Sequence, residues 1–361
     1  LYPSSMARIK GYMKGSPDIL INKDRDFLNK VDFYFVKVLC LNNPTINRDF
    51  PILSSMNEAG IRNFSNDTQG KEFYLDKIAL EDAENFQGLK FKIISGYFYN
   101  NGFNNKVNDI IQFLFNERLK QKKLGNPIEK IYKLLMNSSY GKCLLKPIDS
   151  DIEIVYKEKW GEYLDRNYNF IKEYTEIKDC YIVKKIKPIS NHFNNVSQGV
   201  YVLSMSKRIM NEVITTGEDN NCKIYYTDTD SIHIDYDKVK VLETEFKIKY
   251  GRELTGKNLG QFHIDFDLDN SVGEIKSVKS IFLGKKCYMD VLESKDIDGK
   301  IITGSHLRMK GIPNQSINYT CKKLNKTPYE LYDDLYDNKK IKFNKDMSVS
   351  SMSEFVRQIS F

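Results

Sequence analysis

Two aspartates near the middle of the chain have the type and spacing to hold a metal ion. Asp228 and Asp230 lie in the polar stretch 227–231, between the β-branched and aromatic stretches 224–226 and 232–234. This pattern predicts a β-hairpin with the polar stretch at its tip. Because side chains alternate along a strand, the two carboxylates point the same way if the tip is extended. Mg²⁺ takes such oxygen ligands together with substrate phosphates, although Asp and Thr are also ordinary turn residues.

A predicted helix over 128–144 carries a second set of polar side chains that could bind a phosphate. Its polar face has helical spacing and consists of Lys130, Lys133, Asn137 and Tyr140. Its apolar stripe, which we expect to be buried, consists of Ile128, Ile131, Leu134 and Leu135. A lysine, an amide and a phenol on one side of a helix suit a nucleotide triphosphate and a base. A plain surface helix with a half-buried tyrosine has the same spacing.

The helix before it completes a predicted helical hairpin. Apolar residues recur at helical spacing over 105–123, and Gly125-Asn126-Pro127 ends that helix and starts the next. A cluster of basic residues ends the first helix, with Arg118, Lys120, Lys122 and Lys123, and a short basic turn joins the two helices. We expect this hairpin to project from the rest of the fold.

Composition excludes several classes of protein. With 361 residues, 41% of them hydrophobic, the chain is long enough for two or three packed subdomains. The mean hydropathy of −0.50 and the lack of a long apolar run argue against a membrane span. The six cysteines are scattered without a C-x-x-C pair, which predicts reduced, mostly buried thiols rather than zinc ligands or disulfides. A soluble protein of a reducing, intracellular compartment is the expected class.

The charge is informative through its placement. The formal net charge of +7 is modest, and 23 Tyr and 21 Phe are interleaved with the basic clusters. These clusters are 118–123, 276–286, Arg308 with Lys310, and 322–345. Basic patches with aromatic residues among them suit a polyanion with stackable bases, and solvated lysine-rich helix faces are the alternative.

The remaining elements alternate between strands and helices. Strands are expected at 31–41, 73–75, 89–99, 152–156, 181–186 and 272–292, with a strand end at 1–6, a loop over 42–65 and a turn at Asp298-Gly299. Helices are expected at 198–216, 238–250, 316–323 and 329–336. In the first of these helices Val202, Met205, Ile209 and Val213 face inward, and Lys207 with Arg208 faces outward. Alternation along 284–289 places Lys286 and Tyr288 on one face.

Four short motifs follow one another along the chain. They are Leu1-Tyr-Pro3, Lys133-Leu-Leu-Met-Asn-Ser-Ser-Tyr-Gly-Lys142, Tyr226-Thr-Asp-Thr-Asp-Ser231 and Lys285-Lys-Cys-Tyr288. In this order they resemble family B DNA polymerases, in particular the protein-primed branch of viruses, organelles and linear plasmids. The resemblance spans nearly the whole chain, and the second and third motifs are fairly specific one by one.

The resemblance implies an α+β fold shaped as a polymerase right hand, with an antiparallel-sheet palm, helical-hairpin fingers and a partial thumb. It places the palm at 1–104 (with an insertion) and 196–303, the fingers at 105–145, an insertion subdomain at 146–195 and the thumb at 304–361. The implied activity is DNA-directed DNA synthesis in replication, in which a dNMP from a dNTP is added to a primer 3′-hydroxyl. The implied cofactor is a pair of Mg²⁺ ions, with Mn²⁺ as a substitute. Primer–template DNA, dNTPs and a terminal-protein primer are the implied partners, with no membrane.

The resemblance also assigns roles near the metal ions. Asp230 is the main carboxylate that bridges the two ions, and Asp228 is an accessory carboxylate beside it. Lys286 and Tyr288 hold the primer terminus. Further candidates for DNA binding are the basic residues Lys207, Arg208, Arg308 and Lys310.

Other assigned roles concern the incoming nucleotide. Tyr2 lies under the sugar and excludes a 2′-hydroxyl group. Lys133 contacts the triphosphate, and Arg118 or Lys122 assists it. The pocket for the nascent base pair is lined by Asn137 and Tyr140.

The sequence departs from the family pattern at its start. The first motif of the family reads Asp-x-x-Ser-Leu-Tyr-Pro, and this sequence begins after the Asp and without the proofreading exonuclease. We therefore expect the 361 residues to be part of an active polymerase and to be inactive alone. The insertions typical of the branch, which support terminal-protein contact, strand displacement and processivity, correspond here to 146–195.

Two other functions stay open. A reverse transcriptase or RNA-dependent polymerase also uses a carboxylate hairpin, but usually with adjacent aspartates, whereas Thr229 separates them here. The other is a non-catalytic DNA-binding relative that keeps the cleft but has lost its chemistry. The residue four positions before Leu1 distinguishes these: an Asp supports the polymerase, and another residue supports the binding remnant.

Overall fold

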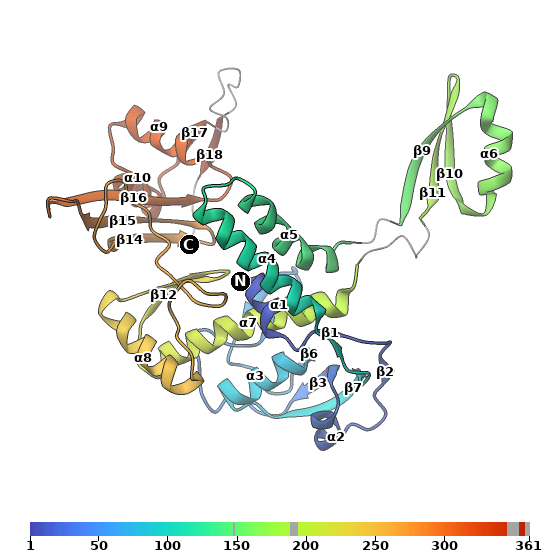
Figure 1. Cartoon of the computed structure of the whole chain (residues 1–361), viewed down its shortest axis with the longest axis horizontal. Coiled ribbons are helices and arrows are strands. Elements are labelled where there is room, and N and C mark those ends of the chain that lie inside the picture. Colours follow the sequence, from blue (N-terminus) through green and yellow to red (C-terminus); the bar gives the residue numbers. More distant parts are fainter. Residues whose placement is uncertain (147–148, 188–193, 345–353, 358–361) are drawn as a thin grey trace. The chain divides into compact units, whose positions relative to one another are not determined.

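The computed structural model describes residues 1–146, 149–187, 194–344 and 354–357 (Figure 1). The chain forms two units, Leu1–Thr215 and Thr216–Phe361. Both mix helices with antiparallel strands, as the α+β prediction requires. Among the residues described, none of the helices combines the length and the apolar character that crossing a membrane requires.

The first unit is built on a four-stranded antiparallel sheet. Its strands, in spatial order, are β2 (Asp18–Ile19), β7 (Phe91–Tyr99), β3 (Phe33–Cys40) and β6 (Glu72–Asp76). Alternation along β3 buries Val36, Val38 and Cys40. These side chains pack with Leu28 of α2 (Arg25–Lys30) and Leu80 of α3 (Lys77–Gln87) in one core. The predicted strands are confirmed, and a hairpin of β4 (Ser54–Met56) and β5 (Arg62–Phe64) lies in the predicted loop.

Helix α3 was not predicted, although its ends carry clear capping signals. The Asp76 side chain accepts a hydrogen bond from the Ala79 N–H over 2.8 Å, which is an N-cap. At the other end Gly88 adopts φ +64°, the left-handed conformation that ends many helices. Reading these two residues as caps would have found the helix.

The chain begins with a helix, and the prediction of a strand end at 1–6 is wrong. Helix α1 (Tyr2–Arg8) holds Pro3 in its first turn, where proline lacks no needed hydrogen bond. The Ser5 hydroxyl donates to the Leu1 carbonyl over 3.1 Å. After α1, strand β1 (Tyr12–Met13) pairs with β8 (Phe103–Asn104).

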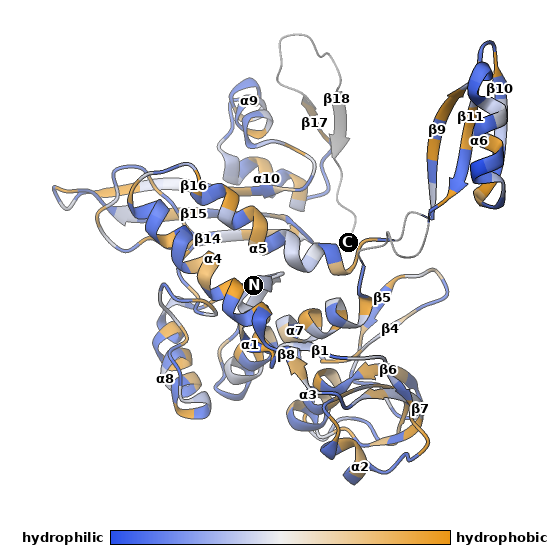
Figure 2. Cartoon of the chain, turned by 45° about the vertical axis from the view of Figure 1, so that its right-hand side comes forward, coloured by the Kyte–Doolittle hydropathy of each residue, from blue (hydrophilic) through white to orange (hydrophobic). Residues whose placement is uncertain are grey.

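The predicted helical hairpin is present, but its apolar stripe is not buried. Helix α4 (Lys106–Lys123) and helix α5 (Glu129–Cys143) pack against each other and against α1. In α5 only Met136 and Cys143 are buried. The expected stripe is exposed instead, with Ile128 at 39%, Ile131 at 55%, Leu134 at 66% and Leu135 at 46%. In Figure 2 the ribbons of α4 and α5 both carry hydrophobic segments. Spacing alone identifies an amphipathic helix, but burial needs another element to cover the stripe.

Residues 149–187 form a small sheet with one helix. Strands lie in the order β10 (Ile171–Ile177), β11 (Cys180–Ile186) and β9 (Ser150–Tyr156), all antiparallel. A short 3₁₀ turn η1 (Lys157–Lys159) leads into α6 (Trp160–Asn167) and η2 (Tyr168–Phe170). Trp160 stacks on Tyr181 with ring centroids 4.2 Å apart. The two predicted strands are confirmed, and Pro188 and His192 lie outside the described residues.

Helix α7 (Val196–Asp219) is the longest helix that the described residues form. Its expected inward face is buried, with Val202, Met205, Ile209 and Val213 all below 10% exposure. The Phe33 ring lies 4.3 Å from that of Tyr201, which attaches α7 to the sheet of the first unit.

The second unit holds the central hairpin and a three-stranded sheet. The hairpin consists of β12 (Ile224–Asp228) and β13 (Ser231–Ile234), followed by η4 (Tyr236–Lys238) and α8 (Val239–Tyr250). The sheet consists of β14 (Lys276–Gly284), β15 (Cys287–Lys295) and β16 (Ile301–Met309). The single strand expected over 272–292 is thus two strands joined at Lys285-Lys286, and the predicted turn at Asp298-Gly299 is confirmed.

The two faces of this sheet have different neighbours. Ile281, Met289 and Leu307 are cross-strand neighbours on one face. They share a core with α9 (Asn314–Leu324), α10 (Pro328–Tyr336) and β17 (Ile341–Asn344), which pairs with β18 (Glu354–Arg357). Phe282, Tyr288 and Arg308 lie on the other face. The predicted palm–thumb boundary at 303/304 falls inside β16, so this sheet and the helices after it form one packed body.

Candidate active site

The central hairpin forms as predicted, but its tip is not an extended strand. Thr229 and Asp230 alone connect β12 to β13. Thr229 has φ +55°, and the Asp230 N–H donates to the Asp228 carbonyl oxygen over 2.6 Å. These are features of a γ-turn with a left-handed centre, which is strained for a β-branched residue. Asp228 and Asp230 were expected to point the same way only if the tip is extended, and that condition is not met because a turn separates them.

Asp228 meets a lysine from a second hairpin. The Lys286 Nζ lies 2.7 Å from the Asp228 Oδ1, across 58 residues of sequence. This hydrogen bond raises the pKa of Lys286, because Asp228 favours the charged amine. Lys286 itself has φ +58° and lies in the turn between β14 and β15. The expected strand alternation of Lys286 with Tyr288 is therefore wrong, although the structure does bring both to the hairpin.

Tyr226 connects these residues. Its hydroxyl oxygen accepts a hydrogen bond from the Lys286 backbone N–H over 2.8 Å. Its ring lies 4.8 Å from that of Tyr288 and is stacked on Phe282 at 5.2 Å. Tyr288 is only 6% exposed, and burial raises its pKa. The predicted primer-binding pair is thus assembled around a tyrosine that had no predicted role.

Arg308 and Lys310 lie next to this group. Arg308 pairs with Tyr288 across β15 and β16, and the Lys310 N–H donates to the Lys286 carbonyl over 2.9 Å. Both side chains are exposed. The Lys286 side chain therefore contacts the aspartate-bearing hairpin, and Arg308 and Lys310 are exposed on the chain segment next to Lys286 and Tyr288.

In the first unit, two tyrosines from separate predicted motifs are in contact. The rings of Tyr2 in α1 and Tyr140 in α5 stack with centroids 4.1 Å apart and planes 15° apart. Burial, and then the contact with Tyr2, raises the pKa of Tyr140 to about 12. The structure thus brings together the residue expected under the sugar and a residue expected beside the base.

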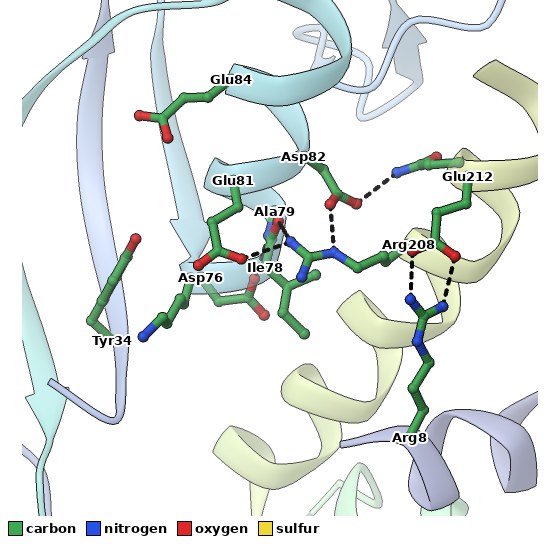
Figure 3. A network of polar contacts seen from close by, with 12 residues as sticks. Arg8, Tyr34, Asp76, Ile78, Ala79, Glu81, Asp82, Glu84, Arg208 and Glu212 are labelled. Atoms are coloured by element: carbon green, nitrogen blue, oxygen red, sulfur yellow. Dashed lines mark hydrogen bonds and ion pairs between the residues drawn. The ribbon is translucent and has the colours of Figure 1, made fainter. Parts of the chain in front are cut away.

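Helix α1 is held firmly on both sides. The Asn108 Nδ2 of α4 donates to the carbonyl oxygens of Met6 and Ile9 over 3.0 and 2.7 Å, which satisfies the end of the helix. Arg8 forms a two-pronged ion pair with Glu212 of α7, with one contact of 2.7 Å (Figure 3). These contacts fix the helix that carries Tyr2, and sequence reasoning missed them because each joins distant residues.

The residues of α4 and α5 that were predicted to contact the nucleotide differ in exposure and in ion pairing. Lys122, Lys133 and Asn137 are exposed. Within the described ranges, Lys122 and Lys133 have no ion-pair partner. Arg118, in contrast, pairs with Glu129 through its Nε over 3.1 Å, which links α4 to α5. Lys122 and Lys133 are therefore available to a ligand, and Arg118 is already engaged.

The two basic residues of α7 also differ. Lys207 is exposed, as expected. Arg208 does not face outward: it donates to Asp82 over 2.6 Å and to Glu81 and the Ile78 carbonyl over 2.9 Å (Figure 3). Its guanidinium attaches α7 to α3 because Asp82 is a buried carboxylate that needs a cation.

The hairpin tip offers two carboxylates of the kind that Mg²⁺ binds. Asp230 is exposed, and the Asp228 side chain retains 19% exposure beside the Lys286 ammonium. Across the ranges that the structure describes, no group of three or more His, Cys, Asp or Glu side chains could hold one ion. Carboxylate oxygens such as these are ligands that a hard divalent cation takes together with water and phosphate oxygens.

Curated proteins that are similar in sequence to this chain are DNA polymerases. A DNA polymerase of Kluyveromyces lactis is 25% identical over 324 residues, which are 88% of this chain and 30% of that protein. A probable DNA polymerase of Neurospora intermedia is 26% identical over 319 residues, or 85% of this chain and 29% of that protein. The chain therefore spans less than a third of the length of these relatives.

Solved structures share the fold. Phi29 DNA polymerase in an orthorhombic crystal form matches with a TM-score of 0.54 and 16% identity, over 87% of this chain and 50% of that one. The same polymerase with primer–template DNA gives a TM-score of 0.52, at 16% identity, over 90% and 50% of the two chains. The family model for DNA polymerase type B, organellar and viral, matches residues 1–238. The chain thus belongs to the organellar and viral type B DNA polymerases.

Proposed function

We propose that this chain carries the nucleotidyl-transfer centre of a DNA-directed DNA polymerase, which adds dNMP from dNTP to a primer 3′-hydroxyl. The observation that carries the proposal is the contact between Lys286 and Asp228 at 2.7 Å. Two hairpins far apart in sequence meet there, so carboxylates for metal ions and cations for phosphates share one place. A buried structural ion pair would not need the exposed aspartate and the exposed Arg308 and Lys310 around it.

The chemistry divides between the carboxylates and the cations. Two Mg²⁺ ions, or Mn²⁺ in their place, would be held by Asp230 and Asp228 and would activate the primer oxygen and stabilise the leaving pyrophosphate. Lys286 neutralises charge on the primer-terminal phosphate. Tyr288, held against Tyr226, orients the primer end.

The nucleotide is assigned to residues of the first unit. Lys133, assisted by Lys122, binds the triphosphate, because both amines are exposed and have no partner among the residues described. The stacked Tyr2 and Tyr140 and the exposed Asn137 recognise the sugar and the base. Arg118 is not retained as a phosphate contact, because Glu129 already occupies it.

DNA is proposed to bind through phosphate contacts from Lys286, Arg308, Lys310 and Lys207. Such contacts make binding salt-dependent and largely independent of sequence. Arg208 is excluded from this set by its ion pairs with Asp82 and Glu81. A terminal-protein primer and a role for 146–195 in strand displacement rest on the resemblance alone. A reducing compartment is supported by the six cysteines, which form no disulfide among the described residues and five of which are buried.

The test is primer extension by a protein that contains these residues, on a primed DNA template with Mg²⁺ and dNTPs. Asp230→Asn is expected to reduce the rate by about a thousandfold or more. Asp228→Asn is expected to reduce it by a smaller factor. The matched control is Asp237→Asn, an exposed aspartate of η4, which should leave the rate unchanged. Extension at full rate by Asp230→Asn would rule out this centre. Extension of an RNA template in preference to DNA would favour a reverse transcriptase, and DNA binding without any extension would favour a binding remnant.

A further inference from the structure

A buried carboxylate lies directly behind the aspartate hairpin. Asp290 of β15 is 0% exposed, and its Oδ1 accepts hydrogen bonds from the hydroxyls of Ser280 and Ser277 over 2.6 and 3.2 Å. Its Oδ2 has no hydrogen-bond donor in the part of the chain that the structure describes. Burying a carboxylate with one oxygen unsatisfied is costly, so the residue needs a reason to be there.

That oxygen faces a histidine of the hairpin. The Nε2 of His233, in β13, lies 3.5 Å from the Asp290 Oδ2. The side chain of His233 is 16% exposed, and its Nδ1 is buried without a hydrogen bond to any described residue. The imidazole is enclosed by the rings of Phe282, Tyr288 and Tyr226, at 5.1, 5.3 and 5.8 Å.

A second histidine nearby does not take this part. His306 lies opposite Asp290 in the β15–β16 register. Burial, and then the charge of Arg308, lowers the pKa of His306, which favours its neutral form. The histidine whose ring nitrogen faces the unsatisfied Asp290 oxygen is His233, at 3.5 Å.

A single residue, Tyr226, connects His233 to the contact between Lys286 and Asp228. Tyr226 is paired with His233 across the hairpin, and the Tyr226 hydroxyl accepts the Lys286 N–H. Lys286 in turn holds the Asp228 carboxylate. We propose that Asp290 and His233 form a positioning pair that acts through Tyr226 to fix Lys286 against Asp228 for the proposed nucleotidyl transfer.

A contact between a carboxylate and an imidazole adds what the aromatic contacts lack. Stacked rings attract one another over a range of offsets and can slide, whereas a carboxylate and an imidazole have a preferred distance and direction. The pair therefore sets the position of the hairpin on the three-stranded sheet. It is a positioning pair and touches neither primer nor nucleotide, and the inference rests on the proposed function.

The first experiment does not depend on polymerase activity. In the 361-residue chain, the acetylation rate of Lys286 is measured by mass spectrometry against that of Lys285, its exposed neighbour in the same turn. His233→Phe and Asp290→Leu should raise the Lys286:Lys285 ratio about threefold to tenfold, because the amine loses its carboxylate. His233→Gln and Asp290→Asn keep a polar contact and should restore most of the original ratio. Asp82→Asn, which breaks a buried ion pair of the first unit, should leave the ratio unchanged.

The second experiment measures primer extension by the same protein as in the test of the proposed function. His233→Phe and Asp290→Leu should lower kcat by about tenfold to a hundredfold with little change in the KM for dNTP, and the two conservative variants should recover activity. If Asp82→Asn, at a melting temperature equal to that of the pair variants, lowered kcat as much as they do, the pair would have only a structural role and the inference would be overturned. An unchanged labelling ratio would overturn it as well. Active Asp228 and Asp230 variants would instead overturn the proposed function, with the labelling result unaffected.

Discussion

The two groups of candidate site residues differ in how far contacts within the protein fix their side chains. Around the hairpin of the second unit, Asp228, Lys286 and Tyr226 are joined by hydrogen bonds within the protein. On helices α4 and α5 of the first unit, Lys122, Lys133 and Asn137 are exposed. One group is already organised before any ligand binds, and the other is left open for a ligand to complete. Groups that handle metal ions gain from fixed geometry, and groups that capture a triphosphate gain from accessible charge.

The largest effect is expected when the central cation of the organised group, Lys286, is removed. Lys286→Ala should lower primer extension by about a hundredfold, because Asp228 loses its partner and the primer phosphate loses a positive charge. Single-turnover kinetics on a primed template would measure this. Lys285→Ala, in the same turn, should cost less than about threefold. Equal effects of the two variants would mean that general positive charge, and not the organised contact, matters.

The open group should respond in affinity rather than in rate. Lys133→Ala should raise the KM for dNTP by about tenfold to thirtyfold and change kcat less, since a charge-assisted contact with the triphosphate is lost. Steady-state kinetics with varied dNTP would show the split. Lys130→Ala, one turn earlier on α5, is the matched control. A drop in kcat at unchanged KM would assign Lys133 to the organised group.

Smaller effects are expected on the affinity for duplex DNA. Arg308→Ala and Lys310→Ala should each weaken duplex binding a few-fold and reduce the slope of log K against log salt by about one. Fluorescence anisotropy between 50 and 200 mM salt, about the range where phosphate contacts dominate, would measure the slopes. The same substitution at Arg208 should leave the slope unchanged but lower the melting temperature, because that guanidinium is paired with Asp82. A reduced slope for Arg208→Ala would return it to the DNA-binding set.

The smallest effect concerns stability of the first unit. Burial raises the pKa of Asp76 to about 6, from 3.8. Because the folded state then holds its proton more tightly than the unfolded state, stability falls as pH rises from about 4 to about 6 and stays lower above that. Asp76→Asn keeps the N-cap of α3 and should raise the free energy of unfolding by about 1 kcal/mol at pH 8, with no gain at pH 4. Urea unfolding at the two pH values tests this, and an equal change at both would contradict the ionic explanation.

Much of the local structure follows from short patterns. The hairpin at β12 and β13, the helices α4, α5 and α7, and the turn at Asp298-Gly299 are predicted because each depends on neighbouring residues. The errors occurred where one pattern fits two structures. Pro3 was taken to end a strand but starts α1, and the alternation that included Lys286 runs through a turn.

The apolar stripe of α5 shows a different limit. Ile131 and Leu134 have the spacing of a buried face, yet both are more than half exposed. Spacing states which side chains share a face, and it does not state whether anything covers that face. In the same way, the position of Arg208 in the helical pattern predicts a surface cation. Its inward position is explained only by the buried Asp82 with which it pairs.

By itself, the sequence determined the type and order of the local elements and the identity of the motif residues, because these depend on contacts within a few positions. The tertiary structure alone decided that Lys286 meets Asp228, that Tyr2 stacks on Tyr140, and that Asp290 faces His233. Each of these pairs joins residues more than 50 positions apart. No local preference encodes such a meeting, since it depends on how whole strands and helices pack.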